Sequence, residues 1–467
     1  MEREVILERK DADDWIYRGE GAANIVLAYT GSNPAFVGKV LRMQKVPRNR
    51  SQCLSDTPVL SIHECLLWKD IGSIVSSPQK ENAKQLYVQH VMSPLLGSDH
   101  VDPGLHIHVS KDFLESVDKN VHSWRPAWRV GTAKINISCY SALLISDHSI
   151  FPDSLEEKPC ISVEIKPKCG FIPNSRFITE GNSVKRSISR FRMHQFLKLH
   201  QNEVSQVSEY DPLDLFSGCK DRIHKAIKAL FAHPQNNLRV FLNGSLVFGS
   251  LAGSTGSTIF VNGEAFENAL KHAIWAEDGL RTMSFVHLVA ETVFKSRVLD
   301  LLLKVQHRDN LDIEGAIHAY YDVVSQPCIV CRDLGEDQTS GKYAILHSIP
   351  LDESFNIVRD YLIAATAKDC SLIISFRPRE NGKQGSPYCD VHLESTNQNF
   401  DYKAYFIDLD MKPLKKMEYY YELDQKILSC YTQMPRTEHK PENAASIETH
   451  RPIYRELIQL LKRYLSD

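Results

Sequence analysis

Residues 160–171, around which the rest of the chain can be arranged, read Cys160-Ile161-Ser162-Val163-Glu164-Ile165-Lys166-Pro167-Lys168-Cys169-Gly170-Phe171. The first half alternates apolar and polar residues, which predicts a β-strand. Pro167 ends the hydrogen-bond ladder of that strand because proline has no N–H group to donate. Glu164, Lys166 and Lys168 are therefore expected together at the end of the strand, where the rotatable donors of a lysine suit a phosphate group.

The segment after this strand is basic: between Glu164 and His200 it carries eight lysines and arginines and only two acids. The cations are Lys166, Lys168, Arg176, Lys185, Arg186, Arg190, Arg192 and Lys198. A helix is predicted over 183–200, and the cations and histidine spaced four apart on it would share one face. They are Arg186, Arg190, His194 and Lys198. Like charges at this spacing repel each other unless an anion binds them. A solvated basic face is the alternative, and the neighbouring lysines of the strand favour an anion site.

The composition, with 43% apolar and 24% charged residues, is that of a soluble globular protein. The 467 residues suffice for two or three domains. A net charge of −3 argues against a polycation for nucleic acid or membrane, so the local basic cluster suits a small polyanion. We see no apolar run of membrane-spanning length and no signal peptide. Eleven cysteines, an odd number, argue against a disulfide framework, and we expect a cytosolic or nuclear protein.

The N-terminal region predicts three short strands, which are separated by a glycine-rich turn and a second turn. They are expected at 15–17, 25–29 and 36–42. In kinases such strands cover the nucleotide phosphates with backbone N–H groups, and the third strand supplies a cation. Arg42 and Lys39 are the candidates, and Glu64 in a predicted helix over 58–71 is a candidate partner for Arg42. Asn24 replaces the third glycine of the G-x-G-x-x-G pattern, so a plain hairpin is the alternative.

Two aspartates bracket a predicted pair of strands in the C-terminal half. A helix over 352–367 leads to Asp369, a strand over 371–376 follows, and a return strand over 402–407 ends at Asp408. This order is that of the base and the metal ligand in kinases, although a single aspartate before a strand is more often a cap. A second basic patch comes next, made of Lys412, Lys415, Lys416 and Tyr420. Asp410 lies inside this region, either as a further metal ligand or pointing away.

His307-Arg308-Asp309 spells the catalytic triplet of protein kinases, but its context argues against that role. Glu314 stands where the motif requires an asparagine, and the sequence contains no Asp-Phe-Gly triplet. The triplet ends a helix predicted over 282–308. We interpret it as a solvated helix end.

His318, Cys328, Cys331 and His347 form a candidate zinc site. The C-x-x-C spacing of the two cysteines is typical of a metal-binding turn, and the histidines would complete a set of nitrogen and sulfur ligands. The outer spacings are irregular, so a redox pair or unpaired thiols remain alternatives.

Six segments together carry a resemblance to a known family. Glu164-Ile165-Lys166-Pro167-Lys168 has the form E-x-K-P-K, and the other segments follow in the expected order. They are Gly19–Asn24, Trp128–Arg129, Pro234–Asn237, Ala367–Cys370 and Ile407–Leu409. Through them the chain resembles the inositol-pentakisphosphate 2-kinases along nearly its whole length, and most closely the plant-type members.

The fold that this resemblance implies is α+β, a two-lobed inositol-polyphosphate-kinase and protein-kinase-like fold. A small antiparallel-sheet N-lobe with the glycine-rich nucleotide loop and the hinge would span 1–148. A larger mixed α/β C-lobe with the inositol-phosphate site would span 149–435, including a zinc-clipped helical insertion at about 212–350. A polar C-terminal tail would occupy 436–467.

The resemblance also implies roles for individual residues. Nucleotide binding is expected of Gly21, Ala22, Ala23, Asn24, Arg42, Ser146, Asp147, His148, Glu164, Lys166, Arg239 and Asp408. Substrate binding is expected of Arg129, Lys168, Arg190, His194, Lys198, Asn236, Asn237, Asp369, Lys412, Lys416 and Tyr420. Catalysis is expected of Asp369 as the base, Asp408 as a magnesium ligand and Lys166 as a cation on the phosphates. Plant-type members carry zinc at the positions of His318, Cys328, Cys331 and His347, and four protein ligands make such a site structural.

The function that the resemblance implies is transfer of a phosphoryl group from ATP, with magnesium, to the axial 2-hydroxyl of inositol 1,3,4,5,6-pentakisphosphate. The product would be inositol hexakisphosphate, or phytate. The expected partner is this small molecule alone, without nucleic acid or membrane, and the chain is expected to act as a monomer. One alternative is an inactive inositol-phosphate sensor on the same scaffold, and another is a zinc-containing nucleic-acid-binding protein.

Overall fold

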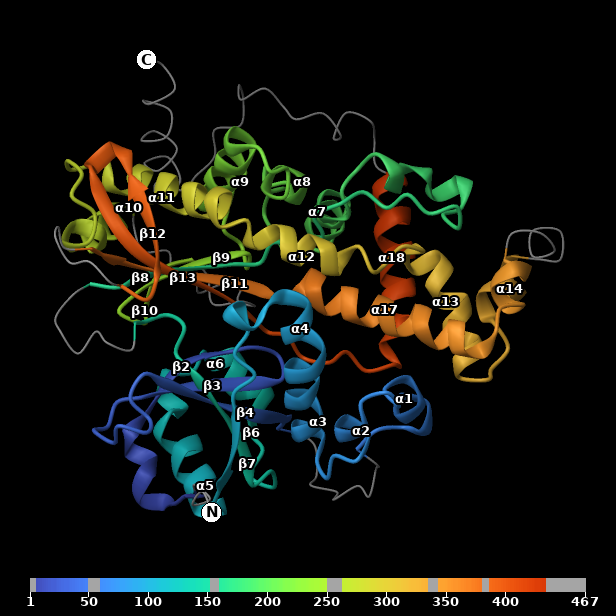
Figure 1. Ribbon diagram of the computed structural model, residues 1–467, viewed down its shortest axis with the longest axis horizontal. Coiled ribbons are helices and arrows are strands. Elements are labelled where there is room, and N and C mark those ends of the chain that lie inside the picture. The colour runs from blue at the N-terminus through green and yellow to red at the C-terminus, as the bar shows by residue number, and fades with distance from the viewer. Residues whose placement is uncertain are drawn as a thin grey trace.

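The computed structural model describes residues 6–48, 59–151, 159–249, 263–334, 343–379 and 386–433. It is a mixed structure of two β-sheets and many helices, which confirms the α+β class (Figure 1). The expected tail at 436–467 lies outside the described residues. Among the helices that are described, none has both the length and the apolar character needed to cross a membrane.

The first sheet is built from the N-terminal part of the chain, in the strand order β1-β5-β7-β4-β3-β2, with β6 paired to β4. Its strands are β1 (Ile6–Leu7), β2 (Trp15–Glu20), β3 (Asn24–Tyr29), β4 (Lys39–Pro47), β5 (Leu105–Val109), β6 (Ala133–Ile135) and β7 (Ser141–Ser146). The three predicted strands are thus confirmed as β2, β3 and β4. We expected an antiparallel sheet here. The structure corrects this prediction at one edge, where β1 runs parallel to β5.

Helix α5 (Lys111–Asn120) and the 3₁₀ segment η1 (Arg9–Asp14) cover this sheet. The apolar side chains between them form a core of their own, which includes Trp15, Leu41 and Phe113. α5 buries Phe113, Leu114 and Val117, which recur at helical spacing, and Ser110 caps its first turn by accepting a hydrogen bond from the Phe113 N–H. Burial of this stripe places the glycine-rich turn between β2 and β3 on a rigid base.

The second sheet is antiparallel throughout, in the order β10-β9-β8-β11-β13-β12. Its strands are β8 (Ile161–Ile165), β9 (Leu238–Leu242), β10 (Ser245–Gly249), β11 (Ser371–Pro378), β12 (Cys389–Leu393) and β13 (Gln398–Ile407). β8 is the strand predicted from the opening sequence stretch, and all five of its residues are buried. Both strands predicted beside the aspartates are also present, as β11 and β13.

Most helices gather around the second sheet (Figure 1). On the C-terminal side of the chain they are α7 (Arg190–His200), α8 (Pro212–Leu215), α9 (Lys220–Ala232), α10 (Gly263–Ala269), α11 (Arg281–Ser296), α12 (Val298–Gln306), α13 (Asp312–Val323), α14 (Ile329–Leu334), α16 (Ala344–His347), α17 (Leu351–Asp369) and α18 (Lys416–Gln433). Between β4 and β5 they are α1 (Ile62–Leu67), α2 (Gly72–Val75), α3 (Lys80–Tyr87), a π-helical turn at Val88–Met92 and α4 (Ser93–Leu96).

The largest core joins the α1–α4 region to the later part of the chain. Leu67, Trp68 and Met92 belong to the same buried cluster as Val163 of β8 and Leu362 of α17. These helices precede residue 148 in sequence but bury their apolar side chains with the second sheet and its helices. The domain boundary at 148 stays a prediction.

Two helix predictions are corrected by the structure. The basic helix begins at Arg190, where Ser189 accepts a hydrogen bond from the Arg192 N–H, and not at 183. Residues Glu180–Arg186 form a separate 3₁₀ segment, η5, so Arg186 does not share the face of Arg190. The helix predicted over 282–308 is divided into α11 and α12 at Arg297, which has a left-handed φ of 55°. The ten cysteines of the described residues are all free, as expected without a disulfide framework.

Candidate active site

The predicted acids and lysines meet at one end of the second sheet. Asp369 lies between two ammonium groups, with Lys412 Nζ at 2.9 Å and Lys168 Nζ at 3.6 Å from its carboxylate. Asp408 lies 3.4 Å from Lys166 Nζ. Residues 166–168, 369, 408 and 412 thus form one constellation of alternating charges, although they come from three separate segments of the chain.

The register of the strands accounts for this meeting. Ser371 of β11 pairs with Ile407 of β13, and Leu372 pairs with Ile165 of β8. The residues just outside these pairs therefore emerge at the same edge: Asp369 ends α17, Asp408 follows β13, and Lys166 follows β8.

Left-handed backbone turns two of these side chains out of their strands. Lys168 has a φ of 64° and Asp408 a φ of 62°, conformations that side-chain-bearing residues adopt rarely. The fully buried amide of Gln306 holds the first of these turns, because its Nε2 donates to the Lys168 carbonyl and its Oε1 accepts from the Gly170 N–H. Nε2 also donates to Ala367 O near the end of α17. A single side chain thus ties the lysine turn to the helix end that carries Asp369.

The charged groups of this constellation shift one another's pKa values. Burial raises the pKa of Asp369, but Lys412 and Lys168 outweigh it, and the net pKa is lower than usual. Asp369 is therefore ionised at neutral pH. Burial lowers the pKa of Lys168 to about 8, with Asp369 opposing the shift. For Lys166, Asp408 and Glu164 outweigh burial and raise the pKa, so this residue keeps its charge.

The glycine-rich turn lies between β2 and β3 in the first sheet. It is closed by a hydrogen bond from the Gly21 N–H to the Asn24 carbonyl, 2.9 Å long, while the Ala23 carbonyl accepts from the Lys45 N–H at 2.8 Å. The Lys45 ammonium also donates to Gly21 O at 2.7 Å and pairs with Glu20. The structure thus places residues 21–24 together in one short turn, and β2, β3 and β4 with their side chains support it.

The support of this turn includes an ion-paired network that the sequence analysis missed. Glu20 accepts from both Lys45 and Arg125, and these three side chains are almost completely buried. Since an unpaired buried charge is costly, each of the three stabilises the others in place. The partners are 25 and 105 residues from Glu20, which is too far for any periodic signal.

Arg42 of β4 does not pair with Glu64, as we had allowed. Its guanidinium forms a bidentate ion pair with Asp410, with Nη1 2.8 Å from Oδ1. Glu64 instead caps α1 through the Ser61 N–H and accepts from the Leu414 N–H. Asp410 therefore points toward the first sheet. Because Asp410 follows Asp408 by two residues, its ion pair with Arg42 brings the arginine near the segment that carries Asp408. Lys39 contacts Ser146 at 3.0 Å.

Glu164 and Arg239 lie side by side on neighbouring strands β8 and β9. The Glu164 carboxylate accepts from Ser371 at 2.9 Å and from Arg239 at 3.3 Å. The buried acid thus anchors the arginine next to the strand that carries Lys166.

The expected hinge follows β7. Asp147 accepts from Arg18 at 2.7 Å, and Arg18 also donates to the carbonyl of Gly244 in the turn between β9 and β10. His148 stacks on Tyr405 of β13, with ring centroids 3.9 Å apart. Burial lowers the pKa of His148 to about 4, so the ring is neutral. Ser146, Asp147 and His148 therefore lie where the first sheet meets the second.

The partly buried side of α7 that carries Arg190, His194 and Lys198 faces the strand-end lysines. His194 lies within electrostatic range of Arg190, Lys198 and Lys168, and burial together with these cations lowers the pKa of His194 to about 3. His194 is thus a neutral donor or acceptor and not a cation. Burial also lowers the pKa of Lys198. The predicted basic stripe is therefore confirmed for Arg190, His194 and Lys198, and it lies next to the turn at Lys168.

The remaining predicted substrate residues divide into two groups. Tyr420 lies near Lys412 and Asp369, and Asn237 is buried and accepts from the Lys166 N–H through its backbone carbonyl at 2.9 Å. Asn236 is its neighbour in the same turn. Arg129 lies over the ring of Trp128 on α6 (Ala127–Thr132), with Glu20 and Arg239 among its charged neighbours, so it lies toward the glycine-rich turn. Lys416 is exposed at the start of α18 and stacks over Tyr419.

The kinase-like triplet at 307–309 does follow a helix end, since α12 ends at Gln306, and His307 is exposed. Our interpretation of a solvated triplet is wrong for Asp309. Asp309 is buried and lies 2.5 Å from Lys368 Nζ, and Arg308 pairs with Asp360 at 2.6 Å. His307 packs on Phe171. Asp309 thus holds the end of α17 through Lys368, next to Asp369, while Arg308 holds the middle of that helix, and both are structural roles.

The predicted zinc ligands converge, and their ligand atoms all lie within 4.8 Å of one another. His318 Nδ1 is 3.2 Å from His347 Nε2, 3.4 Å from Cys328 Sγ and 3.3 Å from Cys331 Sγ. The other nitrogen of His347 contacts Asp322 at 2.7 Å. Asp322 was missed by the sequence analysis, although it lies four residues after His318 and thus on the same face of α13.

Comparison with known proteins identifies one family along most of the chain. A family model described as inositol-pentakisphosphate 2-kinase matches residues 17–426. An inositol-pentakisphosphate 2-kinase of Arabidopsis thaliana is 55% identical over 444 residues, covering 94% of this chain and 98% of the relative. One of Oryza sativa subsp. indica is 51% identical and covers 92% and 96%, respectively. One of Danio rerio is 30% identical over 505 residues, with the same coverage.

Proposed function

This chain belongs to the inositol-pentakisphosphate 2-kinase family, and on that premise we propose that it phosphorylates the axial 2-hydroxyl of inositol 1,3,4,5,6-pentakisphosphate with ATP. The product is inositol hexakisphosphate, or phytate. The chain is an enzyme, a phosphotransferase that acts on inositol pentakisphosphate. The inactive-sensor alternative has no support from the comparisons, and both aspartates that a kinase needs are present.

The observation that carries the proposal is the constellation of Asp369 and Asp408 among the lysines of the strand end. Asp369 accepts the proton of the attacking 2-hydroxyl, whose oxygen bonds the γ-phosphorus of ATP while the bond to the β,γ-bridging oxygen breaks. Its ionised state, maintained by Lys412 and Lys168, suits this role. Because phosphoryl transfer needs little covalent chemistry from the protein, positioning and charge neutralisation account for most of the catalysis.

The nucleotide side of the site is proposed to lie between the two sheets. Residues 21–24 cover the phosphates, Arg42, Lys166 and Arg239 neutralise them, and residues 146–148 with Glu164 line the nucleotide site. Asp408 would hold Mg²⁺, which would supply charge neutralisation to the phosphates. The left-handed backbone of Asp408 directs a half-exposed carboxylate out of the sheet, and this arrangement fits a metal ligand.

The substrate side is proposed to follow the lysine turn and α7. Five phosphate groups carry about −8 to −10 charges in total, so many cations are needed at once. Lys168, Arg190, Lys198, Lys412, Lys416 and Arg129 supply them, and the neutral donors are His194, Asn236, Asn237 and Tyr420. Arg129 has Glu20 and Arg239 among its charged neighbours, so it would approach the substrate from the nucleotide side.

The two-lobed kinase-like arrangement, with a helical insertion closed by zinc, is part of the same proposal. A tetrahedral zinc ion separates two nitrogen ligands by about 3.3 Å and a nitrogen from a sulfur by about 3.6 Å. The distances of 3.2 Å and 3.3–3.4 Å in this cluster fit that geometry. The contact from Asp322 to His347 fits the carboxylate that commonly orients a zinc-bound histidine. His318, Cys328, Cys331 and His347 would hold the ion without an open position. A monomer in the cytosol or nucleus remains our expectation.

The direct test is incubation of the protein with inositol pentakisphosphate, ATP and magnesium, followed by phosphate-resolved chromatography. We expect inositol hexakisphosphate to appear with an equal amount of ADP. Tight binding of the pentakisphosphate without any product would contradict the proposed function and return the sensor as the better explanation.

The pH dependence gives a second test of the substrate site. We expect kcat/KM for the pentakisphosphate to fall as the pH rises through about 8, because Lys168 has a pKa of about 8 and is cationic only below it. The variant Lys168→Arg keeps its charge across this range, so its alkaline limb should move upward. An unchanged alkaline limb in Lys168→Arg would exclude Lys168 as the titrating group.

A further inference from the structure

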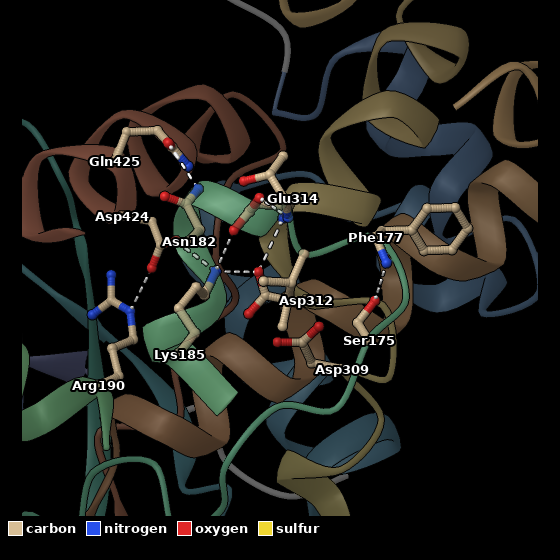
Figure 2. Close-up of polar contacts among 12 residues, drawn as sticks. Ser175, Phe177, Asn182, Lys185, Arg190, Asp309, Asp312, Glu314, Asp424 and Gln425 are labelled. Atoms are coloured by element: carbon tan, nitrogen blue, oxygen red, sulfur yellow. Dashed lines mark hydrogen bonds and ion pairs between the residues drawn. The ribbon is translucent and has the colours of Figure 1, made fainter. Parts of the chain in front are cut away.

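A buried lysine beside the proposed substrate site has carboxylate partners on two helices. Figure 2 shows Lys185 of η5 pointing into a group formed by Asp312, Glu314 and Asp424. Its Nζ is 2.7 Å from Asp424 and 3.1 Å from Glu314, and it also pairs with Asp312. The side chains of Lys185, Glu314 and Asp424 are at most 4% exposed. These are charges that the fold has taken out of water, so each needs its partners.

Asp424 connects this lysine to a proposed substrate residue. One of its carboxylate oxygens accepts from Lys185, while the other, Oδ1, lies 3.2 Å from Arg190 Nε. The contact uses only Nε, so it leaves the terminal amino groups of the Arg190 guanidinium outside the ion pair. Arg190 begins α7, whose next turn carries His194. A guanidinium held at one corner in this way is restricted in orientation before any phosphate arrives.

The other two carboxylates belong to the helix that carries a proposed zinc ligand. Asp312 begins α13, and Glu314 lies four residues before His318 on the same face of that helix. Glu314 also accepts from the Thr179 N–H at 2.9 Å, just before η5. η5, α13 and α18 therefore meet at the Lys185 ammonium (Figure 2).

Three clustered carboxylates could also suggest a cation site. Here the Lys185 ammonium is already paired with all three and neutralises part of their charge. With Lys185 and Arg190 counted, the group carries one net negative charge if all members are ionised. A second cation is therefore not required, and the lysine itself acts as the cation of the cluster.

We propose that Lys185 is a positioning residue, which acts through Asp424 to orient Arg190 toward the inositol phosphate. Through Asp312 and Glu314 it also joins the substrate site to α13 and so to the zinc-ligand region. This inference rests on the proposed function, since it takes the pentakisphosphate as the ligand of Arg190.

Removal of the ammonium changes the partners of Asp424. In Lys185→Met, Arg190 is the one cation that the described contacts still place at Asp424. The three carboxylates then attract the Arg190 guanidinium inward, away from the substrate. We expect the KM for the pentakisphosphate to rise by roughly 3- to 30-fold, the usual range for residues that act through a network. The KM for ATP should stay unchanged, because the ion pairs of Lys185, Asp424 and Arg190 among the described residues include no proposed nucleotide residue.

The experiment is a double-mutant cycle with four proteins: wild type, Lys185→Met, Arg190→Met and the double variant. The KM of each substrate and kcat are measured for all four. If Lys185 acts through Arg190, its effect on the pentakisphosphate KM should disappear in the Arg190→Met background. An effect that persists there in full, or that raises the KM for ATP equally, would overturn the inference.

A matched control separates positioning from simple loss of stability. Arg281→Met removes a buried cation at the start of α11 that pairs with Glu267 of α10 and with Asp278 in the turn before α11. It should lower thermal stability and the active fraction without changing either KM. If Lys185→Met behaves in the same way, its role is structural and the proposal is wrong.

A second variant covers the case in which Lys185→Met does not fold. Asp424→Asn keeps the volume of the side chain and can still accept from Lys185, but it loses the charge that holds Arg190. The same cycle with Arg190→Met then decides the question by the same criterion. If wild type itself makes no inositol hexakisphosphate, the proposed function fails separately. In that case calorimetric binding of the pentakisphosphate to the four proteins tests the link between Lys185 and Arg190.

Discussion

Asp369→Asn should lower kcat by about 10²- to 10⁴-fold, the range for loss of a general base. The amide keeps the shape of the side chain but cannot accept the proton of the attacking hydroxyl. Binding of the pentakisphosphate should stay near that of wild type, because Lys168 and Lys412 remain to contact its phosphates. Single-turnover kinetics would measure the chemical step, and calorimetry would measure the dissociation constant.

Asp360→Asn is the matched control for this result. Asp360 lies on the same helix, α17, and pairs with Arg308 at 2.6 Å, away from the strand end. Its loss should cost some stability and leave kcat close to that of wild type. An Asp369→Asn protein with normal turnover would remove Asp369 from the role of the base.

Loss of the proposed zinc should have the second large effect, on stability. Because four ligands from three short segments depend on one ion, we expect a chelator or Cys331→Ser to lower Tm by roughly 5–10 °C. kcat at saturating substrate, measured well below the new Tm, should be retained, since no zinc ligand is among the proposed reacting groups. Differential scanning calorimetry and metal analysis of the purified protein would check both expectations.

Cys219→Ser controls for the chemistry of thiol replacement, because Cys219 is an exposed free cysteine before α9. It should keep one zinc per chain and the wild-type Tm. An unchanged Tm after complete removal of metal would refute a structural zinc site.

Local patterns in the sequence were sufficient to predict the elements whose formation depends on neighbouring residues in the chain. The alternation of residues 161–165 predicted β8, and apolar runs next to Asp369 and Asp408 predicted β11 and β13. Because the antiparallel register then places the ends of these strands together, the position of the two aspartates followed from the strands alone. The C-x-x-C spacing likewise indicated Cys328 and Cys331 as candidate metal ligands, and the structure brings them together with His318 and His347.

Long-range ion pairs could not be predicted in this way. Arg42 and Asp410 are 368 residues apart, and Lys185 is 239 residues from Asp424. The predicted basic helix also failed at its start, where Lys185 and Arg186 fall in a 3₁₀ segment. The equal four-residue spacing predicted one common face for Arg186, Arg190, His194 and Lys198. In the structure only the residues from Arg190 onward face the turn at Lys168, and Lys185 is directed into the protein.

Two missed residues did have a signal in the sequence. Asp322 follows His318 by four residues, and Asp424 follows Tyr420 by four, so each shares a helix face with a residue that we had selected. For Asp309, in contrast, the sequence favoured a solvated position, and burial against Lys368 was visible only in the folded chain.

Strand and helix periodicity, the paired aspartates and the ligand spacing are local properties, and the amino-acid order was sufficient to reveal them. The partner of each buried charge depends on which distant segments the core brings together. That choice is made by the packing of the whole chain, because a charge removed from water must find its counterpart among whatever side chains surround it. The tertiary structure therefore decided that Arg42 pairs with Asp410, and that Lys185 lies between α13 and α18.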